Sequence, residues 1–188
     1  MQKIILIIAD LTALAANAIV NPANASMLKG GGLCGIIHSK AGEAFAQECV
    51  QLHKENAQYP VSSTKLTTAG KLPAQFVIHA VSPKWVTVKG DKFEALAATY
   101  RNILQEAHTA NARIISMPSI ATGVNGYPQP DSAIVAIKTL TAELPKHPNV
   151  KSLFIVCHNQ RDANAYREAI AQVSTDSVQI LNLIPEAV

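Results

Sequence analysis

The sequence has few charged residues, few aromatic residues and no long apolar run. Asp, Glu, Lys and Arg make up 15% of the 188 residues, and the formal net charge is only +3. No cluster of lysines or arginines forms a basic patch, so the charge favours an anionic ligand without indicating nucleic-acid binding. No apolar run approaches the roughly 18 residues that a membrane helix needs. We therefore expect a globular protein without a membrane partner.

Cysteine is also scarce. Cys34, Cys49 and Cys157 form no CxxC pair and are odd in number, which argues against a disulfide framework or a structural zinc site. Cys34 and His38 are spaced to share a helical face, but no further local Cys or His completes a metal site. We expect a buried thiol and a hydrogen-bonded histidine there, no metal and no cofactor. These features predict a cytoplasmic protein.

The N-terminus superficially resembles a secretory signal, because a lysine precedes an apolar run and an A-x-A sequence follows it. Asp10 interrupts that apolar run after six residues, which is shorter than a typical signal-peptide core. Cleavage after the A-x-A sequence would also remove a good strand, so we expect the segment to belong to the fold.

Predicted strands alternate with predicted helices along the whole chain. This alternation indicates an α/β fold, a three-layer α/β/α sandwich with a central mixed, largely parallel sheet. We expect one domain over residues 1–188, with a core at about 3–173 and a C-terminal extension at 174–188 that adds an edge strand. The expected strands cover residues 4–8, 18–20, 61–69, 75–81, 113–117, 152–157 and 178–183. The expected helices cover residues 35–54 (divided at Gly42), 93–110, 131–144 (capped by Asp131) and 162–173, with a short helix before Ala16.

Ligands of such sheets bind where the carboxyl ends of parallel strands meet. Four strand ends carry the most distinctive residues of the chain, and we expect one cleft built from the loops that follow them. These loops contain Asp10, residues 21–32, residues 119–127, and the pair His158 and Asn159.

The loop after the second predicted strand holds three consecutive glycines, Gly30 to Gly32, before a predicted helix. Glycines let backbone N–H groups approach a ligand, and a helix N-terminus adds partial positive charge, which suits a diphosphate. The side-chain amides of Asn21 and Asn24 suit ribose hydroxyls. A G-x-G-x-x-G pattern is present, but it lies too far beyond the strand for a dinucleotide-binding turn. The pattern favours a nucleotide-like diphosphate ligand.

Simpler structural roles remain open for several of these residues. A tight turn alone would also account for the glycines. Asp10 suits the cap of a short helix as well as an adenine amino group, and Asn21 suits a hydrogen bond to its own loop. His79, within an apolar strand, is expected to be a buried core histidine.

Several segments together resemble the macrodomain family, whose members are ADP-ribose-binding modules. Ala9 to Thr12 resembles the family's G-D-I-T, and Ala18 to Asn24 resembles its A-I-V-N-A-A-N. The segments 30–35 and 119–128 resemble its two phosphate loops. Leu72 and Pro73, followed by residues 77–81, also fit the family pattern. The resemblance extends over about residues 3–173.

The resemblance implies a role for each part of the site. Asp10 would contact the adenine, Leu11 would offer its backbone, and Asn24 would hold the distal ribose as a candidate catalytic residue. The two glycine-containing loops would surround the diphosphate. The full expected ligand-binding set is Asp10, Leu11, Asn21, Asn24, Gly30, Gly31, Gly32, Leu33, Cys34, Ser119, Ala121, Thr122, Gly123, Val124, Asn125, Gly126, Tyr127 and Asn159.

Two departures bear on catalysis. The hydrolytic subgroup that the chain resembles has an aspartate where Cys34 stands, and usually an aromatic residue where Asn125 stands. The resemblance therefore implies binding of ADP-ribose or ADP-ribosylated proteins. Hydrolysis of mono-ADP-ribosyl-protein or of O-acetyl-ADP-ribose stays open, with a water held by the ligand's phosphate as the attacking group. The alternatives are a non-catalytic reader of ADP-ribosylation and a module that binds RNA or another nucleotide.

Overall fold

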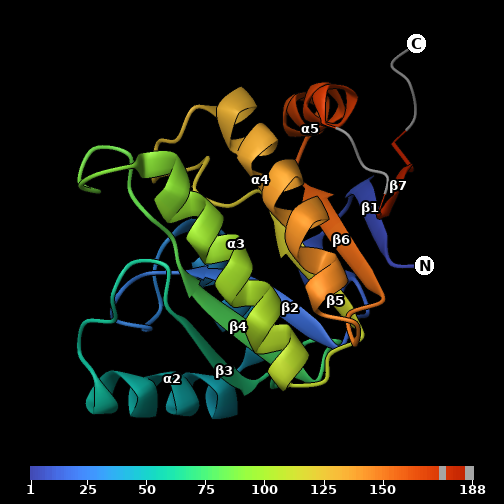
Figure 1. Cartoon of the computed structure of the whole chain (residues 1–188). Helices are drawn as coiled ribbons and strands as arrows, with labels where there is room; N and C mark the ends of the chain where they lie inside the picture. Colours follow the sequence, from blue (N-terminus) through green and yellow to red (C-terminus); the bar gives the residue numbers. More distant parts are fainter. Residues whose placement is uncertain (174–176, 185–188) are drawn as a thin grey trace.

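A computed structural model describes residues 1–173 and 177–184 (Figure 1). Seven strands form one sheet in the order β3-β4-β2-β5-β6-β1-β7. Neighbouring strands run parallel, except that β3 is antiparallel to β4. This is the mixed, largely parallel sheet that the sequence predicts. The strands are β1 (Lys3–Ile8), β2 (Ala18–Ala23), β3 (Thr64–Thr68), β4 (Phe76–Val81), β5 (Ile114–Pro118), β6 (Ser152–Cys157) and β7 (Gln179–Asn182).

Helices cover both faces of the sheet, which confirms the three-layer sandwich. On one face, α3, α4 and α5 enclose the larger core, and α3 and α4 lie side by side across the sheet (Figure 1). On the other face, α1, α2 and the short helix η1 cover a smaller core. The helices are η1 (Leu11–Ala13), α1 (Gly32–Ala41), α2 (Glu43–Glu55), α3 (Lys92–Thr109), α4 (Gln129–Glu143), η2 (Leu144–Lys146) and α5 (Gln160–Gln172).

Strand β2 shows how alternation divides the side chains between the two cores. Val20 belongs to the larger core, whereas its neighbour Ile19 belongs to the smaller one, because successive side chains of a strand point to opposite faces. The prediction that this strand ends at Asn21 and Pro22 is wrong, since β2 continues to Ala23. Strand β2 tolerates Pro22 because only the first two residues of β2 pair with β5. The backbone N–H that proline lacks is therefore not needed for hydrogen bonds between β2 and β5.

Glycine and proline set two helix boundaries differently from the sequence prediction. Gly42 divides the predicted long helix into α1 and α2, as expected, with a φ of 88° that favours glycine. Asp131, however, does not cap α4. The cap position belongs to Pro128, and Asp131 lies in the first turn, where its charge still complements the helix dipole.

The predicted C-terminal edge strand is present as β7, which pairs in parallel with β1. Residues 174–176 and 185–188, which make up part of the predicted extension, lie outside the described residues. Within residues 1–173 and 177–184, no helix has the length and apolar character that crossing a membrane requires.

Candidate functional site

A cleft of about 770 Å³ opens at the carboxyl ends of the parallel strands, between α1 and the loop that follows β5. Strands β1, β5 and β6 each end at this cleft, because parallel strands direct their carboxyl ends to one edge. The cleft brings together seven residues of the expected binding set. These are Asp10, Leu11, Leu33, Ser119, Thr122, Gly123 and Asn159.

The part of the cleft beside β1 and α1 is apolar. Ile8 and Ile36 line it, and they remain 41% and 49% exposed although they are large aliphatic residues. Leu33 and Val156 extend the same apolar wall. Exposed apolar surface gathered in a cleft is typical of a ligand site rather than of ordinary protein surface, and a flat aromatic ring is a suitable occupant.

Asp10 lies at the rim of this apolar part, with two structural partners of its own. Its Oδ1 accepts hydrogen bonds from the backbone N–H of Thr12 at 2.9 Å and from the Thr12 hydroxyl at 2.5 Å, so it caps η1. Its Oδ2 accepts from Lys40 Nζ at 2.8 Å. The hydrogen bond from Lys40, helped by those from Thr12, lowers the pKa of Asp10 to about 2. The carboxylate is therefore charged at neutral pH and can still accept a further hydrogen bond.

The first glycine loop is braced by Asn24. Its Oδ1 accepts from the backbone N–H and the hydroxyl of Ser26 at 3.0 and 2.6 Å, and its Nδ2 donates to the Leu28 carbonyl at 2.9 Å. A Cβ at Gly30 would come within 3.0 Å of Asn24 Nδ2, so this amide also limits which residue can occupy position 30. Asn24 thus organises the loop from within.

Beyond Asn24 the loop turns directly into α1. Gly31 occupies the cap position, and Gly32 begins the helix with a φ of 57°, which favours glycine. A Cβ at either residue would meet nothing within 4 Å, so the space above them is open. The first N–H groups of a helix have no intrahelical acceptor. Together with the helix dipole, they form a suitable cradle for an anion.

A buried polar ladder supports this cradle from beneath. Asn21 Nδ2 lies 3.1 Å from His79 Nδ1 and 3.8 Å from Cys34 Sγ. Because an amide N–H can only donate, His79 Nδ1 accepts, and its Nε2–H then donates to the Thr67 hydroxyl at 2.9 Å. Burial, with a smaller effect from His38, lowers the pKa of His79 to about 3. His79 is the neutral core histidine that the sequence predicts.

The second loop, residues 119–128, forms the opposite wall. The Thr122 hydroxyl donates to Ser119 Oγ at 3.1 Å, and the backbone N–H of Gly126 closes a turn on the Gly123 carbonyl at 3.0 Å. A Cβ at Gly123 would also meet open space. The loop therefore presents backbone to the cleft, as the first loop does.

The match to a known family accords with this geometry. The Macro domain family model matches residues 20–136, which is more than half of the chain. This chain belongs to the macrodomain family. A macro domain-containing protein of an Acinetobacter species is 40% identical to it over 181 residues, which cover 96% of this chain and 99% of that protein.

Two further comparisons concern a named enzyme and a solved structure. A Klebsiella pneumoniae protein named O-acetyl-ADP-ribose deacetylase is 41% identical over 167 residues, covering 88% of this macrodomain and 94% of the relative. The structure of the Oceanobacillus iheyensis macrodomain with ADP superposes with a TM-score of 0.84 at 34% identity, covering 89% of each chain.

Some residues of the expected set do not face the cleft of this macrodomain. Asn21 is fully buried in the ladder beneath the first loop, so its expected direct contact with a ligand is replaced by a supporting position. Tyr127 is 3% exposed, and its hydroxyl donates to the Lys92 carbonyl at 2.8 Å. Ala121 and Cys34 are also buried. Asn125 donates weakly to the Ser82 carbonyl at 3.5 Å.

Two other residues of the expected set are exposed or also cap a helix. Val124 is fully exposed at the tip of the second loop. Asn159 lines the cleft, and its Oδ1 also accepts from the Asp162 N–H at 2.9 Å, which caps α5. Among the described residues, no group of three His, Cys, Asp or Glu is arranged to hold a metal ion.

The sequence did not indicate Lys40, or the apolar residues Ile8 and Ile36, as part of the cleft. Leu33, Ile36 and Lys40 are spaced by three and four residues along α1, so they share one helical face. That spacing was a usable signal, because Leu33 was already expected in the site. Ile8 lies two residues before Asp10, and its apolar run predicted only a strand residue.

Proposed function

We propose that this macrodomain binds ADP-ribose in the cleft. The adenine occupies the apolar part beside Ile8 and Ile36, with its amino group donating to Asp10. The diphosphate crosses from the first N–H groups of α1 to the second loop, and the distal ribose lies beside Asn24. The observation that carries this proposal is one cleft that runs from the apolar end at Ile8 and Asp10 to Leu33 of α1 and to Gly123 of the second loop. The backbone at Gly31 and Gly32, directly before Leu33, is open as well.

We further propose that it hydrolyses O-acetyl-ADP-ribose to acetate and ADP-ribose. The support is the Klebsiella relative of that name, which is 41% identical over 88% of this chain. A water held by the ligand's own phosphate attacks the acyl carbon and gives that phosphate its proton. The ester C–O bond then breaks, and the ribose oxygen leaves and takes that proton back from the phosphate. Asn24 orients the ribose that carries the ester.

The phosphate has this role because neither loop supplies a carboxylate. No Asp or Glu occurs in residues 17–35 or 119–128. The Cys34 thiol lies beneath the first loop, 6% exposed, beside Asn21 and 4.0 Å from the Leu28 carbonyl. Proton transfer from the water therefore depends on a group that the substrate brings with it.

Titration calorimetry with ADP-ribose tests binding, and acetate release from O-acetyl-ADP-ribose in the same preparation tests hydrolysis. We expect both tight binding and acetate release. Binding without release from this ester or from a mono-ADP-ribosylated protein would indicate a reader of ADP-ribosylation. Absence of ADP-ribose binding would refute the proposal, and salt-sensitive RNA binding in its place would favour a nucleic-acid module.

We expect this protein to act in a reducing compartment such as the cytoplasm. Cys34, Cys49 and Cys157 are buried and unpaired, as is usual where thiols stay reduced. We also propose ADP-ribosylated proteins as partners, because a cleft that binds ADP-ribose can bind it when it is attached to a protein.

A further inference from the structure

The segment from the end of β4 to the first residue of α3, residues 82–92, lies against the second loop. We call it the basic loop. The backbone N–H of Trp85 donates to the Asn125 carbonyl at 2.8 Å, and the Tyr127 hydroxyl donates to the Lys92 carbonyl at 2.8 Å. The Trp85 ring also packs edge-on against the Tyr127 ring at 5.2 Å between centroids. The basic loop is therefore fixed to one wall of the cleft.

The sheet order fixes which end of a bound ligand this loop adjoins. Strand β4 neighbours β2 on the side away from β5, β6 and β1. A ligand with its adenine at the end of β1 and its diphosphate at the end of β2 directs its distal ribose toward the exit of β4. This placement rests on the proposed function. In that binding mode, the group attached to the distal ribose lies beside the basic loop.

The basic loop carries positive charge that the described residues do not neutralise. It contains Lys84, Lys89 and Lys92 against a single acid, Asp91, for a formal charge of +2. Lys84 and Lys89 are exposed, and neither forms an ion pair with any described residue. Lys92 Nζ lies over the Trp85 ring, 4.3 Å from its centroid.

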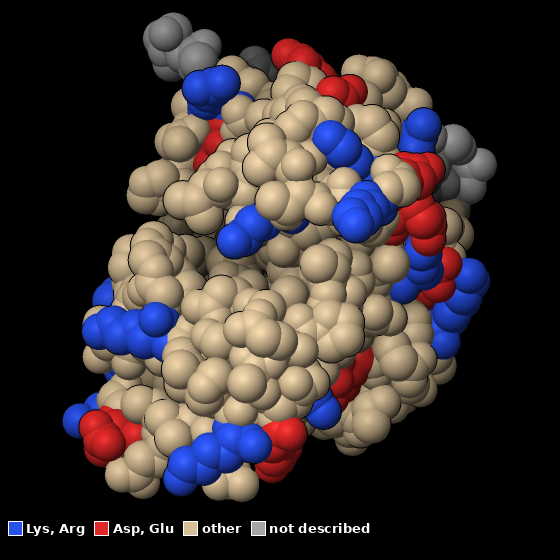
Figure 2. All heavy atoms as spheres, turned by 90° about the vertical axis from the view of Figure 1, so that its left-hand side faces the viewer, with Lys and Arg blue, Asp and Glu red and all other residues tan. Residues whose placement is uncertain are grey.

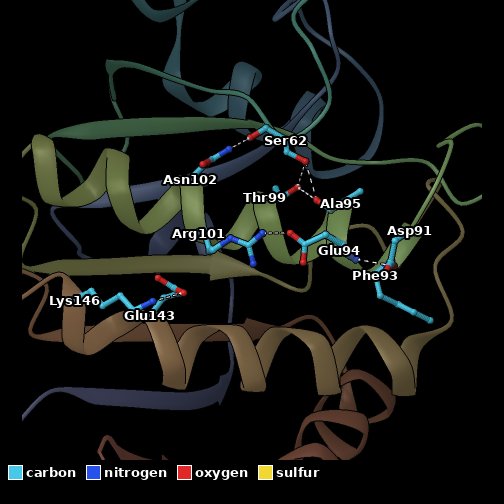
Figure 3. A network of polar contacts seen from close by, with 10 residues as sticks. All are labelled: Ser62, Asp91, Phe93, Glu94, Ala95, Thr99, Arg101, Asn102, Glu143 and Lys146. Carbon is cyan, nitrogen blue, oxygen red and sulfur yellow. Dashed lines mark hydrogen bonds and ion pairs between the residues drawn. The ribbon is translucent and has the colours of Figure 1, made fainter.

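The acidic residues nearest in sequence are engaged elsewhere (Figure 3). Asp91 Oδ1 accepts from the backbone N–H groups of Phe93 and Glu94 at 2.9 and 3.0 Å, which caps α3. Glu94 in turn pairs with Arg101 along the helix. Neither carboxylate forms an ion pair with a lysine of the basic loop, whose formal charge of +2 attracts anionic groups.

The distribution of charged side chains over the face drawn in Figure 2 agrees with a positively charged basic loop. Figure 2 shows a hollow near the middle of the face, with lysine or arginine side chains close to it and aspartate and glutamate toward the margins. Val86 of the basic loop and Val124 of the second loop are 85% and 101% exposed. Apart from Met1, they are the most exposed of the large apolar residues among those described.

We propose that the basic loop binds the protein to which ADP-ribose is attached, through acidic residues that flank the modified residue. Lys84 and Lys89 pair with those carboxylates, and Val86 and Val124 contact the peptide chain between them. A nucleic acid suits the surface less well, because Phe93, Tyr127 and Lys92 already cover the Trp85 ring. A base would need that aromatic face for stacking.

Synthetic ten-residue peptides test this, each carrying ADP-ribose through a triazole link that resists hydrolysis. One peptide has acidic residues on both sides of the modified position, and the other has glutamines there. We expect the acidic peptide to bind about tenfold more tightly at low salt, the size of two or three exposed ion pairs. The preference should shrink as salt shortens the screening length.

The variant Lys84→Gln/Lys89→Gln should reduce the preference to about twofold or less while leaving the affinity for free ADP-ribose unchanged. The matched control, Lys138→Gln/Lys151→Gln, removes two exposed lysines, one in α4 and one directly before β6, and should keep the preference. The reversed variant Lys84→Glu/Lys89→Glu should favour the glutamine peptide.

Three results would overturn the inference. One is equal affinity for the two peptides, and another is the same loss of preference in the control variant. The third is single-stranded RNA that binds more tightly than the acidic peptide and competes through the same two lysines. Each leaves binding of free ADP-ribose intact. Loss of that binding in the unaltered protein would instead refute the proposed function.

Discussion

His79 makes the stability of this macrodomain depend on pH, and replacing it with glutamine should remove that dependence. The ring is fully buried in β4, donates to Thr67 and accepts from Asn21. Protonation would place a charge in the core and leave Nδ1 unable to accept the Asn21 hydrogen bond. Glutamine is neutral at every pH and offers one donor and one acceptor, so His79→Gln isolates the effect of protonation.

The direction and size follow from the two pKa values of this ring. The unfolded chain binds a proton there below about pH 6.5, whereas the folded chain does not until the pH falls to about 3. Between these values the unfolded state holds more protons, so stability is complete above pH 6.5 and falls as the pH is lowered. From pH 7 to pH 5 this linkage removes about 2 kcal/mol of unfolding free energy.

Urea unfolding at pH 7 and at pH 5, followed by circular dichroism, measures the effect in both proteins. Whatever the stability of His79→Gln at pH 7, its loss of unfolding free energy on acidification should be smaller than that of the unaltered protein by about 2 kcal/mol. Subtracting the loss in the variant from the loss in the unaltered protein cancels the contributions of the other titrating groups. An equal loss in both proteins would refute the assignment of His79 as a neutral histidine that stays unprotonated when folded.

Three predictions concern the binding loops and their ligand. Gly31→Glu should abolish ADP-ribose binding in calorimetry. Gly31→Ala should fold and bind, because Gly31 has an ordinary φ of −85° and open space beside it. Binding by the glutamate variant would mean that the diphosphate lies elsewhere. Asp10→Ala should weaken ADP-ribose about tenfold, the size of one hydrogen bond to a charged group, and ribose 5-phosphate by less than about twofold; equal losses would refute the adenine contact. Cys34→Asp should raise the initial rate of acetate release about tenfold or more, because the carboxylate can share the work of the phosphate as base; an unchanged rate would mean that it does not reach the water.

The sequence was sufficient for the layers of the fold and for the edge of the sheet at which the cleft lies. Apolar runs such as Ser152–Cys157 defined strands, and the helical stripe in residues 93–110 defined α3 to within one residue at each end. These features are local, because side-chain periodicity and turn residues act over a few positions. The loops at strand ends were therefore placed correctly relative to the sheet.

The direction of individual side chains was less accessible from the sequence. Asn21 was expected to face a ligand because it follows the strand predicted over residues 18–20, yet β2 continues through Pro22 and the strand's alternation directs Asn21 toward His79. Tyr127 follows a glycine loop, but its ring fills space beside Trp85. Both outcomes depend on partners more than 40 residues away, which no local pattern encodes. Lys40 was missed for a similar reason, because its partner Asp10 is 30 residues away.

On the proposed function, binding and chemistry depend on different parts of this site. The proposed diphosphate cradle consists of backbone N–H groups at Gly31, Gly32 and the second loop, so it does not depend on the identity of residue 34. Asn24 holds the first loop in shape through Ser26 and Leu28, and its loss would disturb both the ribose contact and the cradle. Cys34, by contrast, touches only the ladder beneath the loop and the Leu28 carbonyl. We therefore expect a change at Cys34 to alter the rate of hydrolysis with little effect on affinity, and a change at Asn24 to lower both.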